Sequence, residues 1–269
     1  MMPPGPQERL TGVKKRPFAS ARTIGALILR EMATTYGRSP GGYLWAVLEP
    51  IGGIAILSFV FSFAFRMPPI GISFPLFYAT GVIPLGIYTE SATKIASAIG
   101  YSRALLAYPS VTFLDAILAR FLLHMLTESM VCYLIFGGIF LFLETHTVVD
   151  IPTIAGAILL AGVLGLGVGT LNCFLFVRFP VWQRVWPILM RPLFFISGVF
   201  NLFDALPETL RTWLWYNPMV HIIGLMRHGV YNNYDAAYVS VTYVMGISMA
   251  SFTMGLLLLR KHKNSLLDR

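Results

Sequence analysis

The sequence predicts an all-α polytopic membrane protein with six transmembrane helices, an N-terminal interfacial amphipathic helix, and a re-entrant helical hairpin between spans five and six. Composition is the first reason, because 56% of the 269 residues are hydrophobic, 12% are charged and the mean hydropathy is +0.70. A soluble domain of this length carries many more charges. The second reason is the recurrence of apolar runs of about 20 residues, the length that crosses a hydrocarbon core of about 30 Å.

The third reason is the distribution of basic residues between the two sides of the six spans. Fifteen of the 20 Lys and Arg precede the first span, lie at the end of or after the second, lie after the fourth, or follow the sixth. Only Arg66, Arg211 and Arg227 fall on the opposite side. Since cytoplasmic loops carry the excess of Lys and Arg, we expect both termini in the cytoplasm. Membrane orientation therefore explains the net charge of +8 without a nucleic-acid partner.

Four parts are expected along the chain. They are a basic cytoplasmic tail (1–17), an interfacial helix with a turn (18–44), the six-span domain (45–260) and a second cytoplasmic tail (261–269). The expected spans are 45–65, 74–96, 111–143, 151–177, 185–203 and 239–259. In the interfacial helix, Glu31 falls within the apolar arc, which predicts a protein neighbour that covers it.

The fifth span is interrupted. Pro187 and Pro192 disturb its helix, and Arg191 places a charge within an otherwise apolar run. A guanidinium at that depth must face protein or water. The fifth span is therefore not a plain membrane anchor.

The segment after the fifth span predicts a re-entrant external hairpin over 204–231. Its two apolar parts, 206–216 and 219–231, are each too short to cross the membrane. Between them, Asn217 suits an N-cap and Pro218 suits the first position of a new helix. Irregular backbone at membrane depth needs protein or water around it, so the hairpin should border a pathway.

Spans three and four each carry a distinctive pattern. In span three, Arg120, His124, Thr127 and Glu128 lie on one helical face, and such a face cannot point towards lipid. In span four, small residues recur every fourth position and allow another helix to approach closely: Ala157, Ala161, Gly165 and Gly169. The two cysteines lie inside apolar spans and imply neither a disulfide framework nor a metal cluster.

Three stretches carry a resemblance to a known family. They are Arg-Ser-Pro-Gly-Gly-Tyr-Leu-Trp-Ala-Val-Leu-Glu-Pro (38–50), Arg-Ala-Leu-Leu-Ala-Tyr-Pro (103–109) and Tyr-Asn-Pro-Met (216–219). With the order of predicted elements, they make the chain from Arg22 to its end similar to the membrane subunit of type-2 ABC exporters. Within that superfamily it most resembles the inner-membrane permease of capsular polysaccharide export, with O-antigen and teichoic-acid permeases as near relatives.

The resemblance implies a transporter subunit and not an enzyme. Such a permease works in the bacterial inner membrane, among its lipids, as a homodimer joined to two copies of a separate ABC ATPase. This chain would bind no cofactor, since ATP and Mg belong to the ATPase and the sequence has no G-x-x-x-x-G-K-[ST] phosphate loop. Its substrate would be a polysaccharide, acidic and lipid-linked, passed on to periplasmic and outer-membrane export proteins.

Two sets of candidate site residues follow. By the resemblance, an ATPase coupling segment comprises Ser97, Arg103, Leu105, Leu106, Tyr108 and Pro109. A substrate pathway or gate is assigned to Arg120, His124, Glu128, Arg191, Phe194, Phe195, Trp213, Trp215 and Tyr216. For the charged residues of span three, a polar network that joins neighbouring helices is an equal alternative. For the aromatic residues, the alternative is a position at the membrane interface.

Other functions stay open at this point. One is a type-2 permease for another substrate, such as O-antigen, teichoic acid, a lipid or a drug. Another is an intramembrane lipid-modifying enzyme or metalloprotease that uses His124 and Glu128, although the sequence contains no H-E-x-x-H motif. A third is a proton-coupled carrier, which would usually show internal repeats, and none is evident.

Overall fold

The computed structural model describes residues 19–35, 41–106 and 111–262. These residues form α-helices and one short 3-10 helix, and no strand is found among them. The elements are α1 (Ala19–Thr35), α2 (Gly42–Ala64), α3 (Phe74–Ala96), α4 (Ala98–Leu106), α5 (Phe113–Phe142), α6 (Ile151–Arg178), α7 (Pro180–Ile196), η2 (Phe203–Ala205), α8 (Glu208–Leu214), α9 (Pro218–Val230) and α10 (Val241–Lys261).

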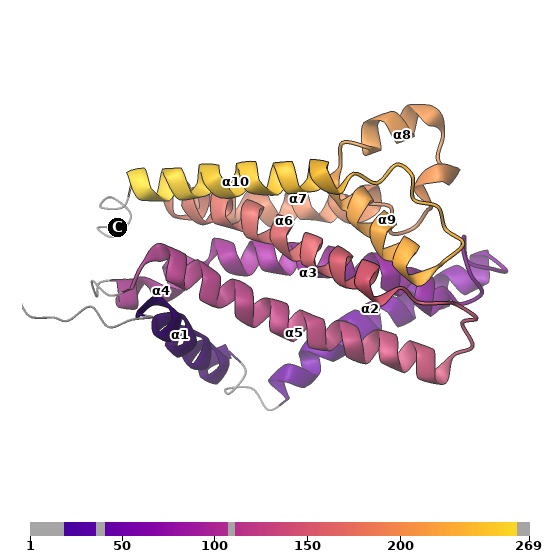
Figure 1. The fold of residues 1–269 in the computed structure, drawn as a ribbon, viewed down its shortest axis with the longest axis horizontal. Helices are drawn as coiled ribbons and strands as arrows, with labels where there is room; N and C mark the ends of the chain where they lie inside the picture. The colour runs from indigo at the N-terminus through magenta and orange to yellow at the C-terminus, as the bar shows by residue number, and fades with distance from the viewer. Residues whose placement is uncertain (1–18, 36–40, 107–110, 263–269) are drawn as a thin grey trace, which may run out of the picture.

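The long helices run between two ends of an elongated molecule (Figure 1). One end carries α1, α4 and the C-terminal end of α10, and the other carries α8 and α9. Within the described residues, the helices long and apolar enough to cross a membrane are α5, α6, α10 and residues Leu44–Ala64 of α2. By the same measure α3 does not qualify, although it has 23 residues, and α7 is too short with 17 residues.

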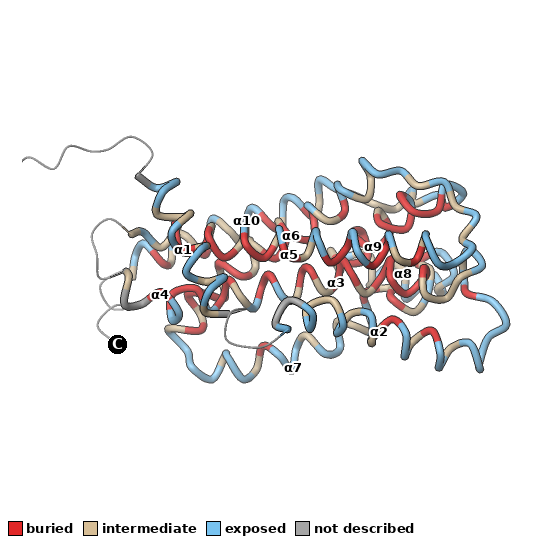
Figure 2. The backbone as a smooth tube through the Cα atoms, turned by 90° about the horizontal axis from the view of Figure 1, so that it is seen from below, coloured by how far each residue is buried: buried red, intermediate tan, exposed pale blue. Residues whose placement is uncertain are grey.

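Helix α6 lies at the centre and packs against α3, α9 and α10. Figure 2 shows the buried residues concentrated on these central helices, whereas α7 at one edge is largely exposed. The predicted small-residue ridge faces α3 of the same chain. A Cβ added at Gly165 would lie 2.5 Å from the Ser91 Cβ, and one at Gly169 would lie 3.0 Å from the Ala92 carbonyl oxygen. The ridge is therefore a helix contact within this chain.

A second close approach joins α6 to α10, and the sequence analysis did not single it out. A Cβ added at Gly167 would lie 2.3 Å from the backbone carbonyl oxygen of Ser248. In return, a Cβ at Gly255 would lie 2.6 Å from the backbone nitrogen of Leu171. Each helix thus supplies a glycine where the other helix's backbone comes nearest, and the two backbones meet without side chains between them.

The bounds of the fifth long helix differ from the prediction. It was expected over 185–203, after a turn at 178–184, but α7 runs from Pro180 to Ile196. Proline suits the first turn of a helix because its missing N–H has no partner there, so the basic segment is helical. The helix ends at Ser197, before Gly198 with its φ of 84°. The other expected long helices begin and end within a few residues of the observed ones.

The predicted restart of the chain at Asn217 is confirmed. The Asn217 side chain accepts a hydrogen bond from the Met219 N–H at 3.0 Å, and Pro218 is the first residue of α9. The two arms of the hairpin differ, since α8 has no buried residue, whereas α9 is buried on nearly all sides against α6 and α3. The Asn217 amide also donates to the Ile196 carbonyl at 3.0 Å, which ties the hairpin to the end of α7.

The contact between α6 and α10 yields a stability prediction. We expect Gly167→Ala to lower the free energy of unfolding by about 1–3 kcal/mol, because the added methyl group overpacks against backbone that must shift. Gly156→Ala, in the same helix, is the matched control, since nothing lies within 4 Å of its added Cβ. Denaturant titration of both variants in detergent micelles measures the difference, and equal stability would contradict the packing argument.

Candidate functional site

A groove between α3 and α7 is lined by two of the predicted pathway residues, Arg191 and Phe194. It has a volume of about 400 Å³. Helix α3 contributes Val82, Leu85, Gly86, Thr89, Glu90 and Thr93, and α7 contributes Trp186, Pro187, Met190, Arg191 and Phe194. The exposed Arg191 makes no hydrogen bond or ion pair with any residue that the structure describes. One wall of the groove therefore offers a cation whose hydrogen-bond donors are available.

Aromatic rings continue from this groove towards the end of the molecule that carries α8 and α9, called the hairpin end below. The Phe200 ring stacks on Phe195 at a centroid distance of 5.5 Å and meets Phe194 edge-on at 5.2 Å. On its other side Phe200 lies 5.6 Å from Phe61 of α2, which in turn lies 5.4 Å from Tyr78 of α3. The structure thus brings the two predicted phenylalanines together and adds three rings that the sequence analysis did not name.

The polar stripe of α5 points into the protein, as predicted. His124 and Thr127 are buried, and the Glu128 side chain is 17% exposed. The His124 Nδ1 lies 3.5 Å from the Lys94 Nζ and 3.8 Å from the Glu128 Oε1. Lys94 also pairs with Glu90 at 3.6 Å, which confirms the expected i,i+4 pair on α3. A polar cluster between α3 and α5 therefore consists of Glu90, Lys94, His124 and Glu128. Its member Glu90 also lines the groove between α3 and α7.

Arg120, one turn earlier on α5, belongs to a different set of contacts. Its Nε lies 2.9 Å from the Glu31 Oε1 of α1, and its Nη1 donates to the Lys94 carbonyl at 2.7 Å. Glu31 therefore has the protein neighbour that its place in the apolar arc predicted. Whether Arg120, His124 and Glu128 also meet substrate stays a prediction.

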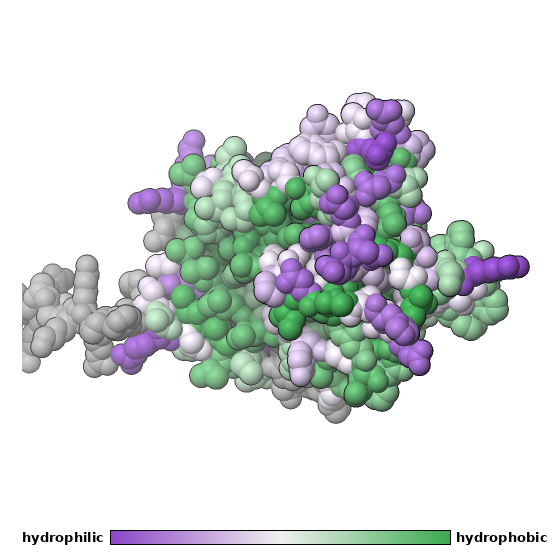
Figure 3. Space-filling model, turned by 45° about the vertical axis from the view of Figure 1, so that its right-hand side comes forward, coloured by the Kyte–Doolittle hydropathy of each residue, from purple (hydrophilic) through white to green (hydrophobic). Residues whose placement is uncertain are grey.

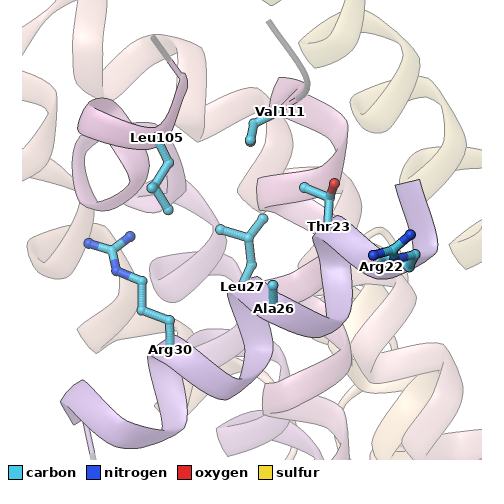
Figure 4. Close-up of a pocket in the computed structure, with 7 residues that line it drawn as sticks. All are labelled: Arg22, Thr23, Ala26, Leu27, Arg30, Leu105 and Val111. Atoms are coloured by element: carbon cyan, nitrogen blue, oxygen red, sulfur yellow. The ribbon is translucent and has the colours of Figure 1, made fainter. Parts of the chain in front are cut away.

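A second groove, of about 530 Å³, lies where α1 passes α4 and the start of α5 (Figure 4). Arg22 and Arg30 of α1 flank an apolar floor that includes Leu27 and, from α4, Leu105. Of the other predicted coupling residues, Ser97 follows the last residue of α3, and Arg103 and Leu106 belong to α4. Tyr108 and Pro109 lie outside the described residues. The coupling segment thus begins at the corner between α3 and α4 and contributes to this groove.

The hairpin end is held by a buried histidine. The Ser240 N–H donates to the His221 Nδ1 at 3.2 Å, so the ring proton is on Nε2, which donates to the Trp215 carbonyl at 2.7 Å. The Trp215 ring packs on His221 and Tyr243, each at 5.0 Å between centroids. Trp215, one of the three predicted aromatic gate residues of the hairpin, therefore packs against the protein on the face of its ring that meets His221 and Tyr243.

The other two predicted aromatic gate residues face outwards. Trp213 is 74% exposed and Tyr216 is 63% exposed. Tyr216 and Trp215 border an open groove of about 410 Å³ with Phe203, Glu208, Arg211 and Thr212. Figure 3 shows polar residues gathered at the hairpin end beside a broad apolar flank. Aromatic and charged groups thus share the surface at this end.

Arg227 is the residue whose importance the sequence analysis missed. It was counted only as a basic residue of the external side, but it is 1% exposed in the last turn of α9. It donates to the carbonyl oxygens of Asn201 at 2.8 Å and Val199 at 3.0 Å, and its guanidinium lies 4.4 Å from the Phe77 ring centroid. Arg227 therefore fastens the turn after α7 to α9 and α3.

The side chains around Arg227 are largely aromatic. Burial raises the pKa of Tyr234 and of Tyr238, so both phenols keep their protons at neutral pH. Their hydroxyls lie 3.2 Å apart, and Tyr234 donates to Asp204 at 3.3 Å. A sequence signal was available, because one arginine ends an apolar helix just before Tyr231, Tyr234 and Tyr238.

Removal of this arginine should loosen the hairpin end. We expect Arg227→Met to lower the free energy of unfolding by about 1–3 kcal/mol, because the buried Val199 carbonyl loses its donor. Limited proteolysis should then cut within 197–205 sooner than in the unsubstituted protein. Arg66→Met removes an exposed arginine and should change stability by less than about 0.5 kcal/mol. Equal behaviour of the two variants would show that Arg227 does not hold the turn.

Comparison with known proteins identifies relatives over nearly the whole chain. It is 31% identical over 245 residues to the polysialic acid transport protein KpsM of Escherichia coli, which covers 91% of this chain and 95% of the relative. Identity is 27% over 236 residues to the capsule polysaccharide export inner-membrane protein CtrC of Neisseria meningitidis serogroup A, covering 87% and 89%. It is 25% over 250 residues to the capsule polysaccharide export inner-membrane protein BexB of Haemophilus influenzae, covering 93% and 94%.

The family described as ABC-2 type transporter matches residues 22–231. That range extends from α1, through the α3–α7 groove, to the end of α9, and so contains both grooves and the hairpin. Together with the 31% identity to a transport protein over nine-tenths of the chain, this match shows that the chain belongs to the ABC-2 type transporter family.

Proposed function

We propose that this chain is the permease subunit of an ATP-driven exporter that moves capsular polysaccharide across the bacterial inner membrane. Three relatives named for polysialic acid or capsule polysaccharide transport support the substrate class. The structural observation that carries the proposal is the Arg191 guanidinium, which lines the α3–α7 groove with no partner among the described residues. A charge of this kind at membrane depth requires water or an anion.

The topology in this proposal has six spans. Helices α3 and α7 lie alongside the four strongly apolar helices and connect the same two ends of the molecule (Figure 1). Because α3 and α7 face each other across the groove, a polar residue on either one need not face lipid. Both termini are cytoplasmic in this arrangement, and α8 and α9 form the external hairpin.

The conduit in this proposal is made by two copies of the chain. A groove open along one side cannot enclose a polymer, so a homodimer would bring two α3–α7 grooves around one passage. Arg191 would meet acidic groups of a lipid-linked polymer, and the rings around Phe200 would offer flat apolar surfaces to sugar faces. Weak, repeated contacts of this kind suit passage better than a deep pocket does.

Energy would come from two copies of a separate ABC ATPase, which bind ATP and Mg. The docking surface in this proposal is the end that carries α1 and α4. There the groove between Arg22 and Arg30 combines two cations with an apolar floor, to which the predicted coupling segment contributes Leu105. Periplasmic and outer-membrane export proteins would receive the polymer at the hairpin end.

The topology is tested by cysteine labelling from outside the membrane. We expect a reagent that cannot cross the membrane to modify Asp235→Cys, which is exposed in the loop after α9, and to spare Lys261→Cys at the end of α10. The buried Cys132 and Cys173 are replaced by serine in both variants to remove background. Labelling of Lys261→Cys alone would place the hairpin in the cytoplasm and overturn the orientation.

The role of Arg191 is tested by export per molecule of permease. We expect Arg191→Gln to insert and to assemble with the ATPase, yet to export roughly tenfold to a hundredfold less polymer. The loss of a charge-assisted contact, about 1.5–3 kcal/mol, accounts for that range. Arg191→Lys keeps the charge and should keep part of the activity, although it loses the planar fork. Surface polysaccharide and membrane-inserted permease are quantified in the same cells.

Arg184→Gln is the matched control for this experiment, because Arg184 is an exposed arginine of the same helix that does not line the groove. Its export should equal that of the unsubstituted protein. If Arg191→Gln lowers permease abundance in proportion to export, the arginine is structural. Unchanged export per molecule would remove it from the pathway, and loss of O-antigen with intact capsule would assign another substrate.

A further inference from the structure

Four groups from three helices and the corner between α3 and α4 meet the Arg120 side chain. The Nε lies 2.9 Å from the Glu31 Oε1 of α1, a contact of opposite charges without an aligned hydrogen bond. The Nη1 donates to the Lys94 carbonyl at 2.7 Å and to the Ser97 Oγ at 2.8 Å. The guanidinium carbon also lies 4.3 Å from the centroid of the Tyr101 ring of α4. With 8% of its surface exposed, Arg120 is essentially enclosed by these partners.

Tyr101 is held from α1 as well. The guanidinium of Arg30 lies 5.6 Å from the centroid of the same ring, and the Thr34 hydroxyl is hydrogen-bonded to the Tyr101 hydroxyl. Helix α4 is therefore attached to α1 through Arg30 and Thr34, and to α5 through Arg120. A displacement of α4 must move Arg120 or break these contacts.

The corner between α3 and α4, to which Arg120 donates its hydrogen bonds, connects the two grooves. Lys94 and Ser97 are at the C-terminal end of α3, and the same helix lines the α3–α7 groove with Glu90 and Thr93 one turn earlier. In the other direction the chain continues directly into α4, whose Leu105 lines the groove beside α1. Thr93 of one groove and Leu105 of the other are thus 12 residues apart along the chain.

We propose that Arg120 is the positioning residue that couples α1 and α4, on the ATPase side, to α3, which forms the wall of the substrate groove. The proposal rests on the proposed function, because it requires a partner that moves α4. An arginine suits this place, since its rigid planar fork reaches a carboxylate and two oxygens of the corner while its flat face lies on a ring. A lysine could keep one of these contacts and not all of them.

The test uses the complete complex of permease and ATPase in proteoliposomes and measures polymer exported per ATP hydrolysed. We expect Arg120→Met to assemble and to hydrolyse ATP, while export per ATP falls by about tenfold, within the usual range for coupling between two sites. Glu31→Lys should have the same effect, and Arg120→Lys a smaller one.

Arg260→Met is the matched control, because Arg260 is an exposed arginine at the same end of the molecule, and its ratio should stay unchanged. An unchanged ratio in Arg120→Met would overturn the inference, even if the amount of complex falls, because a merely structural arginine changes abundance and not the ratio. If the unsubstituted complex does not export polymer, the proposed function fails instead.

Discussion

Every guanidinium buried in this apolar chain has to be met by partners that the protein itself supplies. Arg227 is met by two backbone carbonyls and the Phe77 ring, and Arg120 by Glu31, the end of α3 and the Tyr101 ring. Each arginine therefore fixes segments that are far apart in the sequence. Arg191 differs because it lines a groove and has no such partner among the described residues. That difference separates the two arginines that have partners within the chain from the one assigned to substrate.

The central position of α6 depends on the absence of side chains at a few places. Its glycines let α3 approach on one side and α10 on the other. Helix α9 also packs on α6, and α7 contacts α6 near the start of α7, where the Trp182 ring N–H donates to the Asn172 side chain at 2.9 Å. Helices α2 and α7 lie at the edge of the molecule (Figure 2). The tight core on one side thus leaves the groove of α3 and α7 open on the other, where a second copy of the chain would complete a passage.

Helix α3 links the two functional ends in the proposed exporter. Near the hairpin end it contributes Phe77, on which Arg227 rests, and Tyr78, which joins the aromatic rings. At the opposite end its last turn is held by Arg120. Helix α3 therefore reaches the proposed docking end, the groove wall and the external turn. This arrangement suits the proposed exporter, in which ATP hydrolysis at the end that carries α1 and α4 would alter the substrate passage beside α3.

The sequence by itself determined what local chemistry controls. Long apolar runs, the Asn217 cap with Pro218, the inward polar face of α5 and the Glu90–Lys94 pair all follow from residue type and helical spacing. Only the tertiary structure decided which distant groups meet. Nothing in the sequence joins Arg120 to Glu31 or Arg227 to the carbonyl oxygens of a turn 26 and 28 residues away, because backbone oxygens are identical at every position. The partners of a buried charge are set by the packing of helices, and helix packing is not a property of any single stretch of sequence.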